Sequence, residues 1–154
     1  MDVTQQLLLL GKISLAIVLS GLVGFEREFA EKPAGFRTHM LVGGTASLLV
    51  MMGILIVQSF HPADRINADP IRIIEAIVVG ISFLGAGTII KNVRGEESFI
   101  EGLTTSASIL SVSGIGIAVA LDAYVIAVGM TILNLIINWA LNYLSRYAKS
   151  KVSE

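Results

Sequence analysis

The chain contains no cysteine. This absence excludes a disulfide framework, a thiolate metal site and catalysis by a thiol. Charged residues are also scarce, at 15% of the 154 residues, where a typical soluble domain has about a quarter. The net charge is -1, so no basic field indicates binding to nucleic acid.

Motifs of soluble enzymes are missing as well. The sequence has no Gly-rich phosphate loop, no nucleophile elbow and no His-Glu-x-x-His. We therefore expect a protein that is not an enzyme. The first residues lack a basic region and a small-residue cleavage site, so the first apolar run is expected to be a retained span rather than a signal peptide.

Apolar residues are what the chain has in abundance, at 54% with a mean hydropathy of +0.78. About 20 apolar residues cross a bilayer. The sequence predicts one all-α domain over residues 1–154, a polytopic integral membrane helix bundle with five transmembrane helices. Four spans, with the last two fused, are the weaker alternative. The five predicted spans are residues 5–24, 39–60, 71–90, 103–121 and 123–143.

Basic residues are distributed unevenly between the two sets of predicted loops, and this bias sets the orientation. Eight Lys and Arg residues fall on one side and three on the other. We therefore expect an extracytoplasmic N-terminus and a cytoplasmic C-terminus. The larger set is Arg27, Lys32, Arg37, Lys91, Arg94, Arg146, Lys149 and Lys151; the smaller is Lys12, Arg65 and Arg72.

One short polar segment, residues 24–39, is pressed between the first two spans. Charge at such a place must find water or a partner, and polar groups there are functional candidates. Arg37 or His39 pairing with Glu26 or Glu28 would give a self-neutralised cluster that holds the hairpin together. Alternatively, Glu26 and Glu28 would hold a hydrated divalent cation such as Mg²⁺, or the basic residues would hold an anion or a headgroup phosphate.

A second polar feature lies inside the last predicted span. Thr131, Asn134, Asn138 and Asn142 fall on one narrow helix face. Lipid offers amides no partner, so this face is expected to point at another helix or a second subunit. Hydrogen-bonded packing is the favoured interpretation, and a polar path for an ion or solute is the alternative.

Three segments taken together resemble the MgtC/SapB family. The first combines Gly-Leu-Val-Gly-Phe-Glu-Arg-Glu at 21–28 with Lys-Pro-Ala-Gly-Phe-Arg-Thr-His-Met-Leu-Val at 32–42. The second is Phe-Leu-Gly-Ala-Gly-Thr-Ile-Ile at 83–90, and the third is Gly-Leu-Thr-Thr-Ser-Ala-Ser at 102–108. The sequence departs from the family at Glu101 and Ser82, where members often have arginine and glycine, and at Ser111 or a neighbour, where some virulence-associated members have cysteine.

The resemblance implies a multi-pass protein of the cell inner membrane that is linked to survival at low magnesium and, in intracellular pathogens, to virulence. Members are often described as magnesium transporters, and some act by restraining the proton-translocating ATP synthase. Many carry a soluble C-terminal domain, so this chain is expected to be the membrane module alone. The expected partners are the lipid bilayer, a further copy of the chain and a membrane protein such as the ATP synthase.

From the residues and the resemblance we expect a working surface at the cytoplasmic end. It consists of the polar segment after the first span together with the start of the fourth span, because both lie on the same predicted side. Its members are Glu26, Arg27, Glu28, Lys32, Arg37, Thr38, His39, Thr104 and Thr105. Magnesium or small-ion transport is the alternative function.

Overall fold

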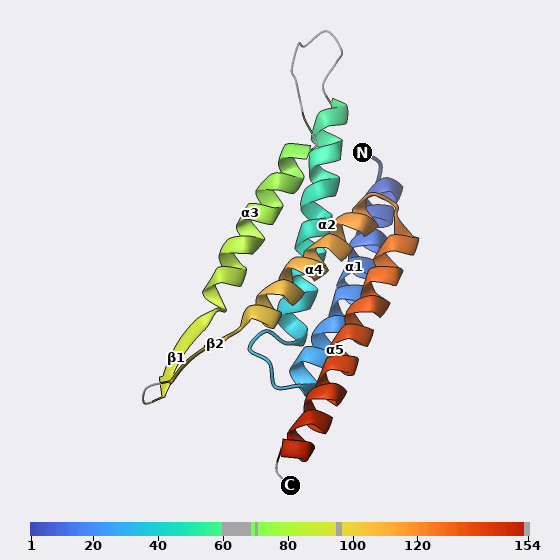
Figure 1. The fold of residues 1–154 in the computed structure, drawn as a ribbon. Helices are drawn as coiled ribbons and strands as arrows, with labels where there is room; N and C mark the ends of the chain where they lie inside the picture. Colours follow the sequence, from blue (N-terminus) through green and yellow to red (C-terminus); the bar gives the residue numbers. More distant parts are fainter. Residues whose placement is uncertain (60–68, 70, 95–96, 153–154) are drawn as a thin grey trace.

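The computed structural model describes residues 1–59, 69, 71–94 and 97–152, with side chains described except at 93–97 and 141–152. The chain is mostly helical, with one short hairpin between the third and fourth helices (Figure 1). In chain order the elements are α1 (Val3–Phe29), α2 (Phe36–Ser59), α3 (Ile71–Gly87), β1 (Ile90–Arg94), β2 (Glu97–Glu101), α4 (Leu103–Ala120) and α5 (Tyr124–Val152).

The core lies where α1, α2 and α4 meet. Each of these helices buries a stripe of residues three or four positions apart, which is the spacing of a single helix face. Small residues on these stripes let the helices approach closely, as is common in membrane bundles. Helix α5 packs on α4 and α1, and α3 packs on α4 and α2 from the other side (Figure 1).

Three of the described helices, α1, α2 and α4, are long and apolar enough to cross a membrane, and α5 contributes a shorter apolar helix, Tyr124–Ala140. Many large apolar side chains are exposed on the outside of the bundle, among them Leu41, Leu48 and Phe83. In water such a surface would be unfavourable, whereas lipid tails accept it. These features support a membrane location.

The helix ends differ from the predicted ones around the polar segment. Helix α1 continues to Phe29, and α2 begins at Phe36, three residues before the predicted start of that span. Glu26 to Glu28 therefore form the last turn of α1 and do not lie in a loop. Glutamate and arginine are good helix formers, so the helix continues past the apolar run, and Pro33 stands in the short connection.

The prediction of purely helical structure is wrong between α3 and α4. Helix α3 ends at Gly87, short of the predicted residue 90, and the predicted loop is an antiparallel pair of strands with Ile90 opposite Glu101. Isoleucine, valine and phenylalanine in these strands favour extended structure. The hairpin carries the chain directly from α3 into α4, as Figure 1 shows at the lower left.

Candidate functional site

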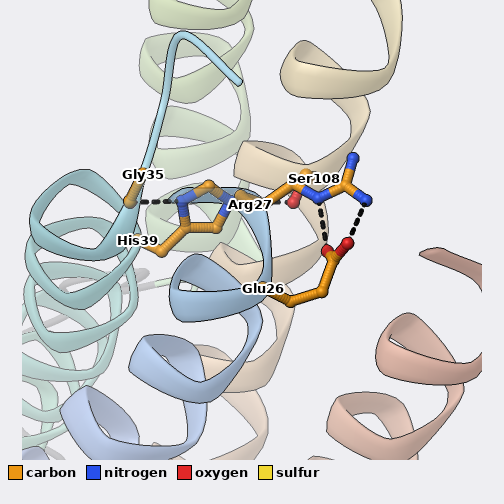
Figure 2. A network of polar contacts seen from close by, with 5 residues as sticks. All are labelled: Glu26, Arg27, Gly35, His39 and Ser108. Atoms are coloured by element: carbon orange, nitrogen blue, oxygen red, sulfur yellow. Dashed lines mark hydrogen bonds and ion pairs between the residues drawn. The ribbon is translucent and has the colours of Figure 1, made fainter. Parts of the chain in front are cut away.

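His39 joins three parts of the chain at one end of the bundle. It lies in the first turn of α2 and is fully buried. Its Nδ1 is 2.8 Å from the carbonyl oxygen of Gly35, and its Nε2 is 2.8 Å from Oγ of Ser108 on α4 (Figure 2). A carbonyl only accepts, so Nδ1 carries a proton. In the neutral ring Nε2 then accepts from the Ser108 hydroxyl.

Gly24 allows His39 to reach this position. A Cβ at Gly24 would lie 2.6 Å from Cβ of His39 and 2.9 Å from Cα of Phe36, so the backbones of α1 and α2 touch here. Any larger residue would push the two helices apart. The polar site therefore depends on a glycine of the apolar span beside it.

Arg27 and Glu26 form an ion pair on the last turn of α1. Nε of Arg27 lies 2.6 Å from Oε2 of Glu26, and one terminal nitrogen lies 3.1 Å from Oε1 (Figure 2). Arg27 is only 4% exposed because it continues the buried stripe of α1, while Glu26 is half-buried. A two-point contact with a carboxylate is the geometry that lets a guanidinium be buried.

The remaining carboxylate of the segment supports the start of α2. Oε2 of Glu28 accepts a hydrogen bond of 2.8 Å from the backbone N–H of Phe36. This satisfies one of the free amides at a helix N-terminus. Among the described residues, neither Glu26 nor Glu28 forms the expected pair with Arg37 or His39. Glu26 instead pairs with Arg27, and Glu28 accepts from the Phe36 amide.

The predicted working surface divides into a buried frame and an exposed face. Arg27, His39 and Thr105 are buried, and Glu26 is half-buried. The others point outward at the same end of the molecule. These exposed members are Glu28, Lys32, Arg37, Thr38 and Thr104.

Ser108 completes this site, although it is not a member of the predicted working surface. It is one helical turn beyond Thr104, on the buried stripe that also contains Thr105. Its position within the third motif and its helical spacing were the available signals. Only the packing of α2 on α4 identifies it as the partner of a histidine 69 positions away.

The described residues do not fit a magnesium site within one chain. Nowhere in the described part of the structure do three His, Asp or Glu residues come together. Glu26 and Glu28 are two positions apart on one helix, where side chains do not face each other, and they bind different partners. Mg²⁺ prefers near-octahedral oxygen coordination and would have to displace both partners.

The described residues of the polar stripe on α5 face the bundle. Nδ2 of Asn134 donates to Oγ of Ser111 on α4 at 2.8 Å, and Thr131 is buried and donates to its own helix at Ala127. Nδ2 of Asn138 is buried and has no hydrogen-bond partner among the described residues. The side chain of Asn142 lies outside the described residues. The Asn134 contact corresponds to the hydrogen-bonded packing favoured from the sequence.

A separate ion pair ties α1 to the α4–α5 turn at the opposite end. Nζ of Lys12 lies 2.6 Å from Oδ1 of Asp122, and the hydroxyl of Tyr124 donates to the same oxygen at 2.5 Å. Asp122 has a φ of 60°, which an aspartate in a tight turn tolerates. The hydrogen bonds from Lys12 and then Tyr124 hold the pKa of Asp122 below its ordinary value.

The chain is similar in sequence to several known proteins. The chain is 34% identical to Protein SapB of Bacillus subtilis over 113 residues, 73% of this chain and 47% of that protein. It is 32% identical to the putative magnesium transporter YhiD of Escherichia coli K12 over 126 residues, 82% of this chain and 57% of that protein. It is 37% identical to Protein MgtC of Brucella abortus over 103 residues, 66% of this chain and 38% of that protein.

The chain thus spans about half the length of the curated relatives it matches. No solved structure matches it. The similarity to the MgtC family extends over residues 13–147 and so includes the Arg27–Glu26 ion pair, the His39 network and most of each described helix. The chain belongs to the MgtC family.

Proposed function

We propose that this chain is an inner-membrane protein of magnesium-stress homeostasis that acts by binding a membrane protein and modulating transport, with the ATP synthase as one such partner. The observation that carries the proposal is the division of the polar end into a buried frame and an exposed face. The Arg27–Glu26 ion pair and the hydrogen bonds of His39 hold the frame, so the exposed residues are presented in a fixed arrangement. Preorganised polar groups bind a partner at lower entropic cost.

The exposed face has mixed charge and lies at the membrane boundary. Lys32 and Thr38 are exposed, and so is Glu28, whose carboxylate accepts a hydrogen bond from the start of α2. Charged residues at the rim of an interface steer association and fix its orientation. Lys32 and Thr38 are therefore the side chains expected to touch the partner, while Arg27 and His39 hold them in place.

Affinity purification from magnesium-starved membranes tests partner binding. We expect the tagged wild-type chain to retain a membrane protein that the double variant Lys32→Ala, Thr38→Ala loses. Lys91→Ala, an exposed cation on β1, serves as the matched control and should retain it. Equal recovery with the double variant, at equal amounts of folded chain, would count against this surface.

Transport of magnesium or another small ion is the second candidate function. Two observations favour it: the name of the Escherichia coli relative, and the buried polar atoms of Ser20, Ser47 and Asn138, for which the described part of the structure offers no hydrogen-bond partner. Vesicles containing the purified chain and a magnesium-sensitive dye discriminate the two functions. Magnesium flux that Glu26→Ala and Asn138→Leu both abolish would replace partner binding with transport.

A further inference from the structure

A shallow groove runs along the outside of the bundle between α1 and α2. Its volume is about 410 Å³, and α1 contributes Ile13 and Ile17 to one wall. The other wall is a single face of α2, because its members are three or four residues apart. These α2 residues are Arg37, Met40, Leu41, Gly44, Thr45 and Leu48.

The length of the groove matches one leaflet of a bilayer. Arg37 and Leu48 are separated by three helical turns, or about 16 Å along the axis, at roughly 1.5 Å per residue. The hydrocarbon core of a bilayer is about 30 Å thick, so one leaflet is about half of that. The groove starts at the polar end of the bundle and ends near the middle of α2.

Among the described residues, Arg37 is the only charged residue that lines this groove, and none of the described carboxylates forms an ion pair with it. It is exposed, and among the described residues no hydrogen bond or ion pair engages its side chain. The neighbouring carboxylates are occupied, since Glu26 binds Arg27 and Glu28 binds the Phe36 amide. A guanidinium at the edge of an apolar groove is complementary to a phosphate attached to an acyl chain.

We propose that this groove binds an anionic phospholipid, with one acyl chain against Ile17, Gly44 and Leu48 and the headgroup phosphate on the guanidinium of Arg37. The arginine stem covers the apolar wall while its head stays at the level of the phosphates. If a second copy of the chain occupied the groove instead, that copy would have to place a carboxylate opposite Arg37. This inference stands apart from partner binding, because it requires only the bilayer.

Native mass spectrometry of the purified chain in detergent, titrated with phosphatidylglycerol or phosphatidylcholine of the same acyl chains, tests the headgroup contact. We expect phosphatidylglycerol to bind more tightly to the wild type, and Arg37→Gln to weaken that binding about tenfold, because a charge-assisted hydrogen bond is lost. Lys91→Gln removes an exposed cation on β1 that does not line the groove and should leave binding unchanged.

A second pair of variants tests the acyl contact. Leu48→Trp fills this groove, whereas Leu49→Trp faces a different groove, between α2 and α3. Only Leu48→Trp should weaken phosphatidylglycerol binding. Equal affinity for both lipids with no effect of Arg37→Gln, competition by inorganic phosphate alone, or a shift from dimer to monomer in Arg37→Gln without loss of lipid would each overturn the proposal.

Discussion

His39 occupies a buried position where both ring nitrogens have a partner. Replacing it with alanine leaves the buried Ser108 hydroxyl without that partner, whereas the Gly35 carbonyl still accepts from the backbone N–H of residue 39. An unsatisfied buried group costs about 1–3 kcal/mol, so we expect His39→Ala to lower the free energy of unfolding by about that amount. Chemical unfolding in detergent measures it.

The coupling between His39 and Ser108 separates this hydrogen bond from simple loss of volume. We expect the double variant His39→Ala, Ser108→Ala to be less destabilised than the sum of the single variants, because each single change already breaks the same bond. Thr38→Ala, next to the histidine but exposed, should change stability by less than about 0.5 kcal/mol. Additive losses would show that the 2.8 Å contact contributes nothing.

Asp122 makes stability depend on pH at the other end of the bundle. Its pKa in the folded protein is held below the ordinary value of 3.8 by hydrogen bonds from Lys12 and Tyr124. The pair therefore adds stability at every pH above that ordinary value, and this stability is lost as the pH falls through the folded pKa. Asp122→Asn should lower the melting temperature near pH 7, and the difference from wild type should shrink as the pH falls below 3.8 and disappear below the folded pKa.

A control variant at another exposed carboxylate shows whether the dependence of stability on pH is specific to Asp122. Glu75 on α3 is exposed, and Glu75→Gln should leave the melting temperature close to that of the wild type across the same range. A difference between Asp122→Asn and wild type that stays constant into acid would rule out the ion pair as its source.

At the scale of helices, α1 and α2 pack closely against each other at Gly43 on α2. A Cβ there would collide with the hydroxyl of Ser20 on α1 and would lie 2.6 Å from its Cβ. Overpacking of this kind costs about 1–3 kcal/mol. We expect Gly43→Ala to destabilise the bundle by about that amount and Ser20→Gly to restore much of the loss, as measured by unfolding in detergent.

The same helices offer a control for the effect of alanine itself. A Cβ at Gly114 on α4 would meet nothing within 4 Å, so Gly114→Ala should be neutral or slightly stabilising. If both alanine variants behave alike, the α1–α2 contact is looser than the structure has it.

At the scale of the whole molecule, the orientation in the membrane remains a prediction from the distribution of basic residues. The absence of cysteine makes it directly testable with single-cysteine variants and a membrane-impermeant maleimide. Lys32→Cys, between α1 and α2, should be labelled only after cells are opened. Leu121→Cys, in the exposed α4–α5 turn, should be labelled in intact cells. Labelling of both from the same side would contradict the three predicted spans between these two positions.

The number and order of the helices could be predicted from the sequence, because apolar segments of membrane length and the polar residues that interrupt them are local features. The hairpin at β1 and β2 was missed, since its pairing is a contact between two short segments rather than a run of similar residues. The helical course of Glu26 to Glu28 was also missed, because charged residues suggest the end of a span without showing where the helix itself ends.

By itself, the sequence determined the helical membrane character, the polar cluster at residues 24–39 and the family. The tertiary structure decided which polar groups meet. Arg27 pairs with Glu26, His39 hydrogen-bonds to Ser108, and Lys12 pairs with Asp122. The physical reason is the sequence separation over which each kind of interaction acts. Hydropathy and helix propensity act within a few residues, whereas a hydrogen bond across 69 positions exists only once small residues have let α1, α2 and α4 close on one another.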